Sequence, residues 1–298
     1  MMTQLLLYYA LFASALSVNK MLLSFVSLWF FVALRRLTAG IILFIYHVFT
    51  SPRMHFNYIR QDAVKILGIS VLTMFVPSIL KAYGFKYLVS SKAALLGSLD
   101  PLITAVYAYL LWGEKLTLTK MIGMMLSFFG IFILLATGSS TETLFGGISI
   151  VSWPELAIIG SLIISRYGWI LARDVLKSER YSSSELSSLI MITSGMYALI
   201  AAYFLHEYNF YALPITSHTT LLFAYSVIFG EIIGYTIYGN LLKKHNITLI
   251  SLSGLSIPLF VHLYGPFLLN EPLSVTFFVA FGFFALGMYI FYRDTEKN

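Results

Sequence analysis

The sequence predicts an all-α integral membrane protein whose ten transmembrane helices form two inverted five-helix repeats. Three observations lead to this fold class. Apolar residues fill 59% of the 298 positions and charged residues only 11%, and the mean hydropathy is +0.84. The apolar residues gather in blocks of about 20, the length of a helix that crosses a bilayer. The third observation is an internal repeat in which equivalent residues lie 157 positions apart.

The apolar blocks predict where each transmembrane helix lies. The strands of a membrane barrel would alternate apolar and polar residues over about ten positions, and this sequence lacks that alternation. The connections between blocks are short, so no soluble domain is expected. The predicted spans are residues 5–23, 28–48, 66–83, 91–111, 119–137, 154–172, 186–206, 220–241, 247–269 and 274–292.

The charge distribution predicts how the chain is oriented in the membrane. The net charge is +6, but the basic residues lie mostly in short connections, so we expect lipid and not nucleic acid as the partner. With both termini inside, twelve Lys and Arg residues fall in cytoplasmic connections and four in outer ones. No basic residue precedes the first block, which we therefore interpret as a transmembrane helix and not a signal peptide. The expected location is the plasma (inner) membrane, with both termini cytoplasmic.

The internal repeat divides the chain into two similar halves. Three pairs of residues share one offset of 157 without a gap: Pro101 and Pro258, Glu114 and Glu271, and Gly130 and Gly287. We expect a first repeat at residues 1–137, a connecting segment at 138–153 and a second repeat at 154–298. Because each repeat holds five spans, an odd number, the second repeat enters the membrane upside down.

These residues resemble a known family, the ten-helix EamA-type transporters of the drug/metabolite transporter superfamily. The resemblance covers nearly the whole chain, and the paired spacing from proline to glutamate is its most specific part. Two positions depart from the pattern, with Asn270 and Ala280 where glycine is usual. The matching residues are Arg36-Leu37, Ser98-Leu99-Asp100-Pro101, Gly113-Glu114-Lys115-Leu116, Gly123 and Gly130 in the first half, and Pro258, Glu271-Pro272-Leu273 and Gly287 in the second.

The resemblance implies a carrier that works by alternating access around a central cavity. Members of the family export or exchange amino acids, other metabolites or nucleotide-linked compounds. Because charged residues of both signs occur within the spans, we expect a small polar metabolite, most simply an amino acid or related zwitterion. The alternative is a nucleotide-type metabolite such as S-adenosylmethionine, taken by exchange. We expect no cofactor, and a monomer or a homodimer.

Two other classes of membrane protein fit the sequence less well than a carrier. The six histidines form no metal-binding or catalytic motif, so an enzyme is not expected, and no metal site is predicted. The chain has no cysteine, which excludes a thiol nucleophile and a Cys-based zinc site. A channel or scaffold would show a continuous polar helix face, which we do not find.

Charged side chains within the spans are the main candidates for a substrate site. Each costs about 2.5–3.5 kcal/mol at a helix centre, so it should face a cavity or a partner. Arg166 and Glu231 are the deepest, and we expect them to bind opposite ends of the substrate or to form a buried ion pair that only joins helices. Further candidates for the same cavity are Asn19, Lys20, Asp100 and, in the second span, Arg36 or its neighbour Arg35.

Several other residues receive a predicted role from their place in a span. Tyr167 and Tyr235 neighbour the deep charges and could form cavity walls. Pro101 and Pro258 fall inside predicted spans, where each removes a backbone hydrogen bond and acts as a hinge or a fixed kink. The two glutamates that share the repeat offset, Glu114 and Glu271, are each expected to cap the helix that follows.

Overall fold

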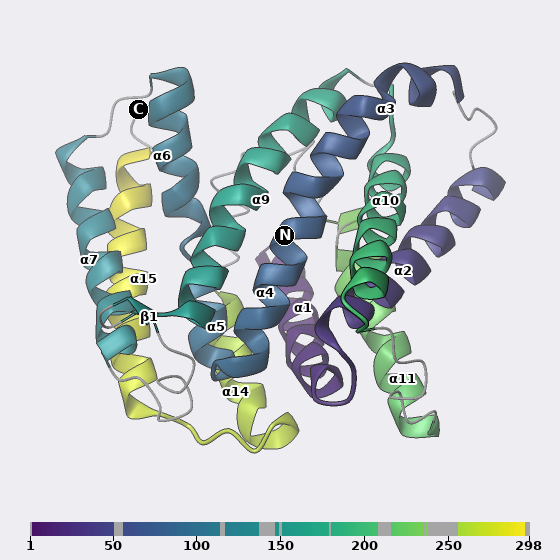
Figure 1. Ribbon diagram of the computed structural model, residues 1–298. Coiled ribbons are helices and arrows are strands. Elements are labelled where there is room, and N and C mark those ends of the chain that lie inside the picture. The colour runs from purple at the N-terminus through teal and green to yellow at the C-terminus, as the bar shows by residue number, and fades with distance from the viewer. Residues whose placement is uncertain are drawn as a thin grey trace.

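The computed structural model describes residues 2–50, 56–113, 117–136, 147–148, 151–178, 180–207, 216–234, 236–237 and 256–295. Nearly all of these residues are helical (Figure 1), so the predicted fold class is confirmed. Tyr235 and Glu114, which the sequence singled out, lie outside the described residues.

The elements follow one another in the order that the apolar blocks predict. The first half holds α1 (Met2–Leu23), α2 (Leu28–Thr50), α3 (Phe56–Ser70), the π-helical segment η1 (Val71–Phe75), α4 (Val76–Tyr87), α5 (Ser90–Gly97), α6 (Asp100–Trp112) and α7 (Leu118–Ala136). A small antiparallel ribbon of β1 (Gly147–Ile148) and β2 (Val151–Ser152) joins the halves. The second half holds α9 (Trp153–Lys177), α10 (Ser183–Phe204), α11 (Ser217–Tyr225), the π-helical segment η2 (Ser226–Ile233), α14 (Ser256–Leu268) and α15 (Val275–Thr295).

Each predicted span overlaps a helix among the described residues. The agreement is close where the description is continuous: the block 28–48 becomes Leu28–Thr50, and 119–137 becomes Leu118–Ala136. Residues 238–255 are not described, so the count of ten stays a prediction. Five described stretches are long and apolar enough to cross a membrane: Leu28–Thr50, Arg60–Tyr87, Ser90–Leu111, Trp153–Lys177 and Ser183–Phe204.

The outside of the bundle is apolar, as a lipid-facing surface must be. Phe267, Phe49 and Val64 are 87%, 85% and 83% exposed. A soluble protein seldom exposes so many large apolar side chains together, and here they surround a core of buried aliphatic and aromatic residues. The multi-pass membrane assignment therefore agrees with both the length of the helices and the chemistry of their outer faces.

Local capping residues set the start of several helices. Ser182 accepts a hydrogen bond from the backbone N–H of Glu185 at 3.0 Å, and the Glu185 carboxylate accepts one from the backbone N–H of Ser182 at 3.4 Å. This reciprocal capping box starts α10. At the start of α9 the Glu155 carboxylate accepts a hydrogen bond from the backbone N–H of Ser152, and Pro154 occupies the first turn. The caps supply partners for backbone N–H groups that have none inside the helix.

Glycines let α7 and α15 cross at close range, and the crossing reveals the repeat. A Cβ on Gly123 would lie 2.6 Å from the carbonyl oxygen of Gly287, and one on Gly130 would lie 2.5 Å from that of Ala280. At the repeat offset of 157, Gly123 corresponds to Ala280 and Gly130 to Gly287. Replacing each residue by its repeat equivalent therefore turns the contact of Gly123 with Gly287 into that of Ala280 with Gly130. A two-fold axis between the repeats requires this.

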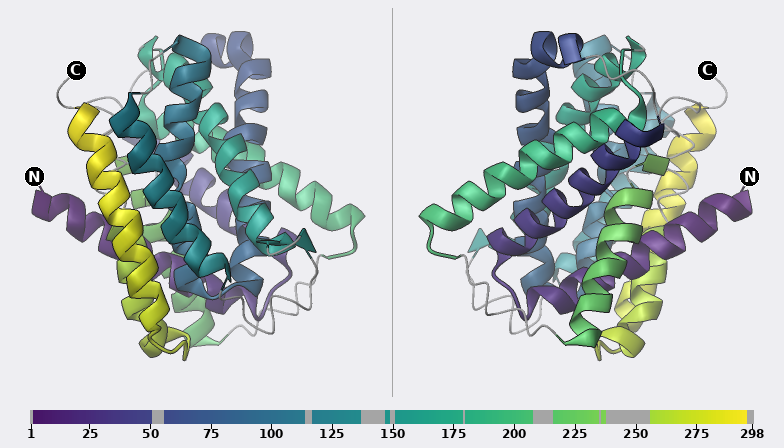
Figure 2. Two further views of the ribbon diagram at one scale, coloured as in Figure 1. Left: turned by 90° about the vertical axis from the view of Figure 1, so that its left-hand side faces the viewer. Right: turned by 90° about the vertical axis from the view of Figure 1, so that its right-hand side faces the viewer.

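The axis passes between Ser127 and Phe284 and lies in the membrane plane. The Ser127 hydroxyl donates to the Phe284 carbonyl oxygen at 3.2 Å, and these residues are 157 positions apart. From Gly123 to Gly130 the residue number along α7 increases, while that of the contacted residue on α15 decreases from Gly287 to Ala280. The two helices therefore run antiparallel (Figure 2). Equivalent helices that run antiparallel across the membrane are related by an axis perpendicular to them, so the repeats are inverted.

A second close crossing, of α2 with α10, lies on the other side of the bundle in Figure 1. A Cβ on Gly40 would meet Ile192 at 2.8 Å, and one on Gly195 would meet Leu37 at 2.8 Å. Each glycine thus contacts, on the other helix, the residue three positions before that helix's glycine. This second antiparallel crossing of equivalent helices supports the same in-plane axis.

The span 91–111 differs from its prediction because it is interrupted. The helix α5 ends at Gly97, Ser98 and Leu99 form a turn, and α6 begins at Asp100. Pro101 therefore lies in the first turn of α6 and not in mid-helix, which is a position that proline tolerates because its missing N–H has no partner there anyway. Pro258 is buried and is the third described residue of α14. A hinge at either proline stays a prediction.

The α7–α15 crossing predicts opposite effects of two glycine substitutions on one helix. Gly287→Ala should lower the free energy of unfolding by about 1–3 kcal/mol, because the new Cβ would lie 2.5 Å from the Gly123 carbonyl oxygen. Gly282→Ala is the matched control, since nothing lies within 4 Å of its Cβ. It should be neutral or stabilising by up to about 1 kcal/mol. Thermal unfolding in detergent measures both, and equal midpoints would contradict the crossing.

The orientation of the chain is open to a labelling test in this cysteine-free background. Ser178 and Ser217 are exposed and lie beyond opposite ends of α10. If both termini are cytoplasmic, Ser217→Cys should react with an impermeant maleimide added outside intact cells, and Ser178→Cys only after permeabilisation. The reverse pattern would place the termini outside.

Candidate functional site: a charged cavity between the repeats

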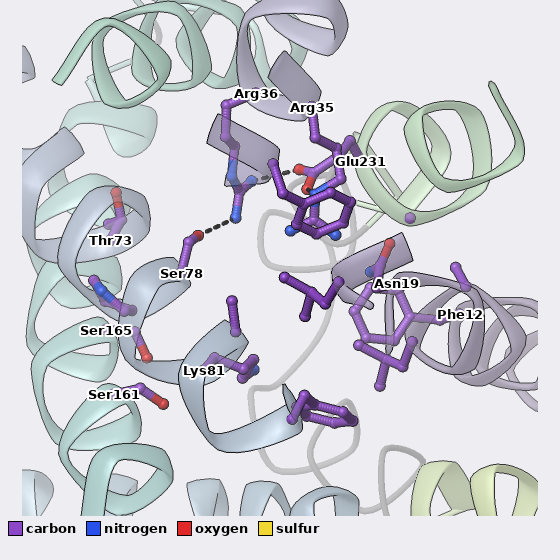
Figure 3. A pocket seen from close by; sticks show the side chains of 18 of the residues that line it. Phe12, Asn19, Arg35, Arg36, Thr73, Ser78, Lys81, Ser161, Ser165 and Glu231 are labelled. Carbon is purple, nitrogen blue, oxygen red and sulfur yellow. Dashed lines mark hydrogen bonds and ion pairs between the residues drawn. The ribbon is translucent and has the colours of Figure 1, made fainter. Parts of the chain in front are cut away.

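A cavity of about 110 Å³ lies between the two repeats and receives residues from α1, α2, η1, α4, α9 and η2. Its chemistry is mixed. Figure 3 shows Arg35, Arg36 and Glu231 together in one part of the cavity, with Lys81, Ser161 and Ser165 in another. The polar lining residues are Asn19, Arg35, Arg36, Thr73, Ser78, Lys81, Ser161, Ser165 and Glu231, and the aromatic ones are Phe12, Phe31, Phe85 and Trp169.

Glu231 is the acidic centre of this cavity. It is 1% exposed and forms ion pairs with two arginines of α2. The Arg35 Nε atom lies 2.9 Å from one carboxylate oxygen, and Arg36 Nη1 donates to the other. A carboxylate this deep in a membrane protein requires compensation, and two guanidinium groups provide it.

Arg36 also joins the two repeats. Its Nη2 atom donates to the Ser78 hydroxyl at 2.6 Å, and Nη1 lies 3.3 Å from the Met74 sulfur as well as against Glu231. At the repeat offset of 157, Met74 corresponds to Glu231. Arg36 thus contacts Met74 and Glu231, which occupy the same position in the two repeats, and only Glu231 is charged.

The π-helical segments contribute to the cavity from both repeats. The segments η1 and η2 occupy equivalent places in the two halves, and Thr73 of η1 and Glu231 of η2 line the cavity. Such segments are rare and occur frequently at functional sites, because the inserted residue redirects the side chains beside it. Both repeats therefore contribute a π-helical segment to the cavity wall.

One face of α9 and one face of α1 complete the walls. Ser161, Ser165 and Trp169 follow at four-residue intervals and so share a face of α9. On α1, Asn19 lines the cavity and accepts a hydrogen bond from the Ser226 hydroxyl. Of the predicted site residues, the structure therefore brings Asn19, Arg36 and Glu231 together.

The structure does not bring Arg166 and Glu231 together. Arg166 is buried and pairs with Asp100, with Nε 3.0 Å from Oδ1, and neither residue lines the cavity. Successive residues of a helix point about 100° apart, so Arg166 turns away where Ser165 turns inward. Tyr167 turns further out, being 39% exposed and stacked on Tyr107 at 6.1 Å between ring centroids. Tyr235 is outside the described residues.

Lys20 lies at a second hollow of about 640 Å³ and not in the central cavity. Its Nζ atom is 2.6 Å from Glu271 Oε1. Glu271 in turn accepts hydrogen bonds from the backbone N–H of Ser90 at 3.0 and 3.2 Å. Glu271 therefore caps α5 of the other repeat, which corrects the expectation that it caps the helix following it.

Sequence reasoning left several cavity residues out of the candidate set. Lys81 could have been found, because it is a lysine inside the predicted span 66–83. Trp169 and the two serines on its face could have been found by their shared four-residue spacing. Arg35 and Arg36 were alternatives for one position, and the structure places both on the cavity. Among the described residues, no group of three His, Asp or Glu side chains is placed to hold a metal ion.

Comparison with known proteins identifies the family. The EamA-like transporter family matches the chain twice, over residues 2–136 and 152–293. The chain belongs to the EamA-like transporter family. It is accordingly a multi-pass membrane transporter and not an enzyme, as the sequence predicted.

Relatives of this EamA-like chain extend over nearly its whole length. Proteins of Chlamydia muridarum and Chlamydia trachomatis, each named S-adenosylmethionine/S-adenosylhomocysteine transporter, are 28% and 26% identical over 97% of this chain and cover 90% and 88% of their own lengths. The Bacillus subtilis transporter YvbV, itself uncharacterized, is 23% identical over 83% of this chain and 76% of its own. A solved crystal structure shares the fold with a TM-score of 0.69, at 15% identity, over 99% of this chain and 96% of that one.

The Arg166–Asp100 pair predicts a rescue of stability. Arg166→Met alone should destabilise the protein, by less than the roughly 3–5 kcal/mol of a fully buried pair, because the Asp100 side chain is 29% exposed. Adding Asp100→Leu should recover most of that loss, since no uncompensated charge remains. Thermal unfolding of the three proteins in detergent measures the effect. A double variant no more stable than Arg166→Met would show that the pair does more than join α9 to α6.

Proposed function

We propose that this transporter carries S-adenosylmethionine across the membrane in exchange for S-adenosylhomocysteine. The observation that carries the proposal is the end-to-end similarity to relatives with that name, over 97% of the chain. The charges in the predicted spans indicate a zwitterion as substrate, either a simple amino acid or, as the alternative, S-adenosylmethionine. The relatives favour that alternative.

The chemistry of the cavity suits this pair of compounds. Both carry an α-amino acid group with a carboxylate and an ammonium, which a site holding Arg35 and Glu231 can pair with. Both carry an adenine ring, for which Phe12, Phe31 and Trp169 offer aromatic faces. S-adenosylmethionine adds a sulfonium cation, and cations are attracted to such faces.

The size of the cavity supports a carrier that changes shape. Pockets for ligands of this size enclose roughly 300–1,000 Å³, and the cavity here measures about 110 Å³. The helices around it must therefore separate before S-adenosylmethionine can bind. Inverted repeats provide two equivalent packings for such a movement, because each repeat can adopt the arrangement of the other.

Exchange of these compounds has an electrical consequence that can be measured. S-adenosylmethionine carries one net positive charge and S-adenosylhomocysteine none, so exchange without a coupled ion moves one charge per cycle. Moving that charge through 100 mV is worth about 2.3 kcal/mol. Purified protein in liposomes loaded with S-adenosylhomocysteine should therefore take up labelled S-adenosylmethionine, and a valinomycin potential, negative inside, should raise the accumulation.

Exchange of S-adenosylmethionine for itself is the matched control. It moves no net charge, so the potential should leave it unchanged. Loading the liposomes with methionine or leucine instead tests the simple amino acid as substrate. The proposal fails if these amino acids drive uptake as well as S-adenosylhomocysteine does, or if internal S-adenosylhomocysteine has no effect.

A further inference from the structure

Two serine hydroxyls of α9 lie in the wall of the central cavity. Ser161 and Ser165 are four residues apart, so they share one face of the helix and are separated by about 6 Å along its axis. Figure 3 shows both serines in the part of the cavity that holds Lys81, away from Glu231. A group bound in this part of the cavity would therefore meet both hydroxyls.

The hydrogen of each of these hydroxyls is already used within α9. The Ser161 hydroxyl donates to the Ile158 carbonyl oxygen at 2.6 Å, and the Ser165 hydroxyl donates to that of Leu162 at 3.2 Å. A serine hydroxyl has one hydrogen and two acceptor lone pairs, so an oxygen that donates can still accept. The two serines therefore offer hydrogen-bond acceptors to the cavity, while their hydrogens point to the backbone of their own helix.

The charges around the cavity decide which kind of donor suits these acceptors. The carboxylate of Glu231 lies in the other part of the cavity, paired with Arg35 and Arg36. The charged side chain that Figure 3 shows near the serines is the cation Lys81. An ammonium or a sulfonium bound beside the serines would meet this like charge at low effective dielectric, because the space is small. The serines therefore suit a neutral donor.

We infer that Ser161 and Ser165 accept hydrogen bonds from the exocyclic amino group of the adenine ring of the transported compound. The inference rests on the proposed function, because adenine is the base that S-adenosylmethionine and S-adenosylhomocysteine share. The amino group of adenine is a neutral donor with two hydrogens, one for each serine. Each ribose hydroxyl, in contrast, has a single hydrogen and carries acceptor lone pairs of its own.

The aromatic residue on the same face of α9 agrees with this assignment. Trp169 follows Ser165 by four residues and also lines the cavity, so it offers an aromatic surface to a flat base whose amino group reaches the serines. All three side chains belong to one helix. Their spacing is therefore kept when the helices around the cavity separate to admit the substrate.

A comparison of two ligands across serine variants tests the inference. S-adenosylhomocysteine and its 6-deamino analogue, in which hydrogen replaces the amino group of the base, differ at the proposed contact. Dissociation constants for both are measured on purified protein in detergent, by titration calorimetry. Loss of the amino group should weaken binding to the wild type by about 5- to 100-fold, as expected for two neutral hydrogen bonds. In the double variant Ser161→Ala with Ser165→Ala that ratio should fall to about 1 to 3.

The matched control is Ser194→Ala in α10. The Ser194 hydroxyl is fully buried and donates to the Met191 carbonyl oxygen at 3.1 Å, so it makes the same bond to the residue three positions earlier. Ser194 does not line the cavity, and its variant should keep the wild-type ratio. Each single variant of the two α9 serines should give an intermediate ratio. Unfolded protein is absent from both titrations alike, so a partial loss of stability leaves the ratio unchanged.

The outcomes separate the inference from the function on which it rests. A ratio that the double variant leaves at the wild-type value overturns the two serines as the site of the amino group and leaves S-adenosylhomocysteine as a ligand. Equal binding of the two ligands by the wild type does the same. A wild type that binds neither ligand overturns the proposed function, and the inference with it.

Discussion

A carboxylate buried within a bilayer needs a positive charge beside it, and the elements around the cavity of this protein meet that requirement. Glu231 lies in the second repeat, and the arginines that neutralise it come from α2 of the first. Because Arg36 also contacts Ser78 and Met74, one guanidinium joins α2, η1, α4 and η2. The cavity forms where these elements meet.

The inverted repeat makes this centre symmetric in backbone and asymmetric in charge. The glycine crossings of α7 with α15 and of α2 with α10 relate the halves closely. At the position facing Arg36, however, one repeat supplies Met74 and the other Glu231. The two halves are therefore similar in backbone, while a single asymmetric charge site lies between them.

Among the described residues, charged side chains outside the cavity form ion pairs that join helices. Arg166 with Asp100 and Lys20 with Glu271 are each pairs between segments distant in sequence. Such pairs replace the water that charged groups lose in the membrane. A deep charge alone therefore does not identify a substrate site, and what distinguishes Arg35, Arg36 and Glu231 from these pairs is that they line the cavity.

The sequence by itself determined the multi-pass membrane class, the approximate position of most described helices and the inverted repeat. Those features depend on hydrophobic length and on an offset of 157, which are local or periodic properties of the chain. Only the tertiary structure decided which charges pair and which of them line the cavity. Partners such as Arg36 and Glu231 are 195 positions apart, and a rotation of about 100° per residue separates Ser165, which faces the cavity, from Arg166, which does not.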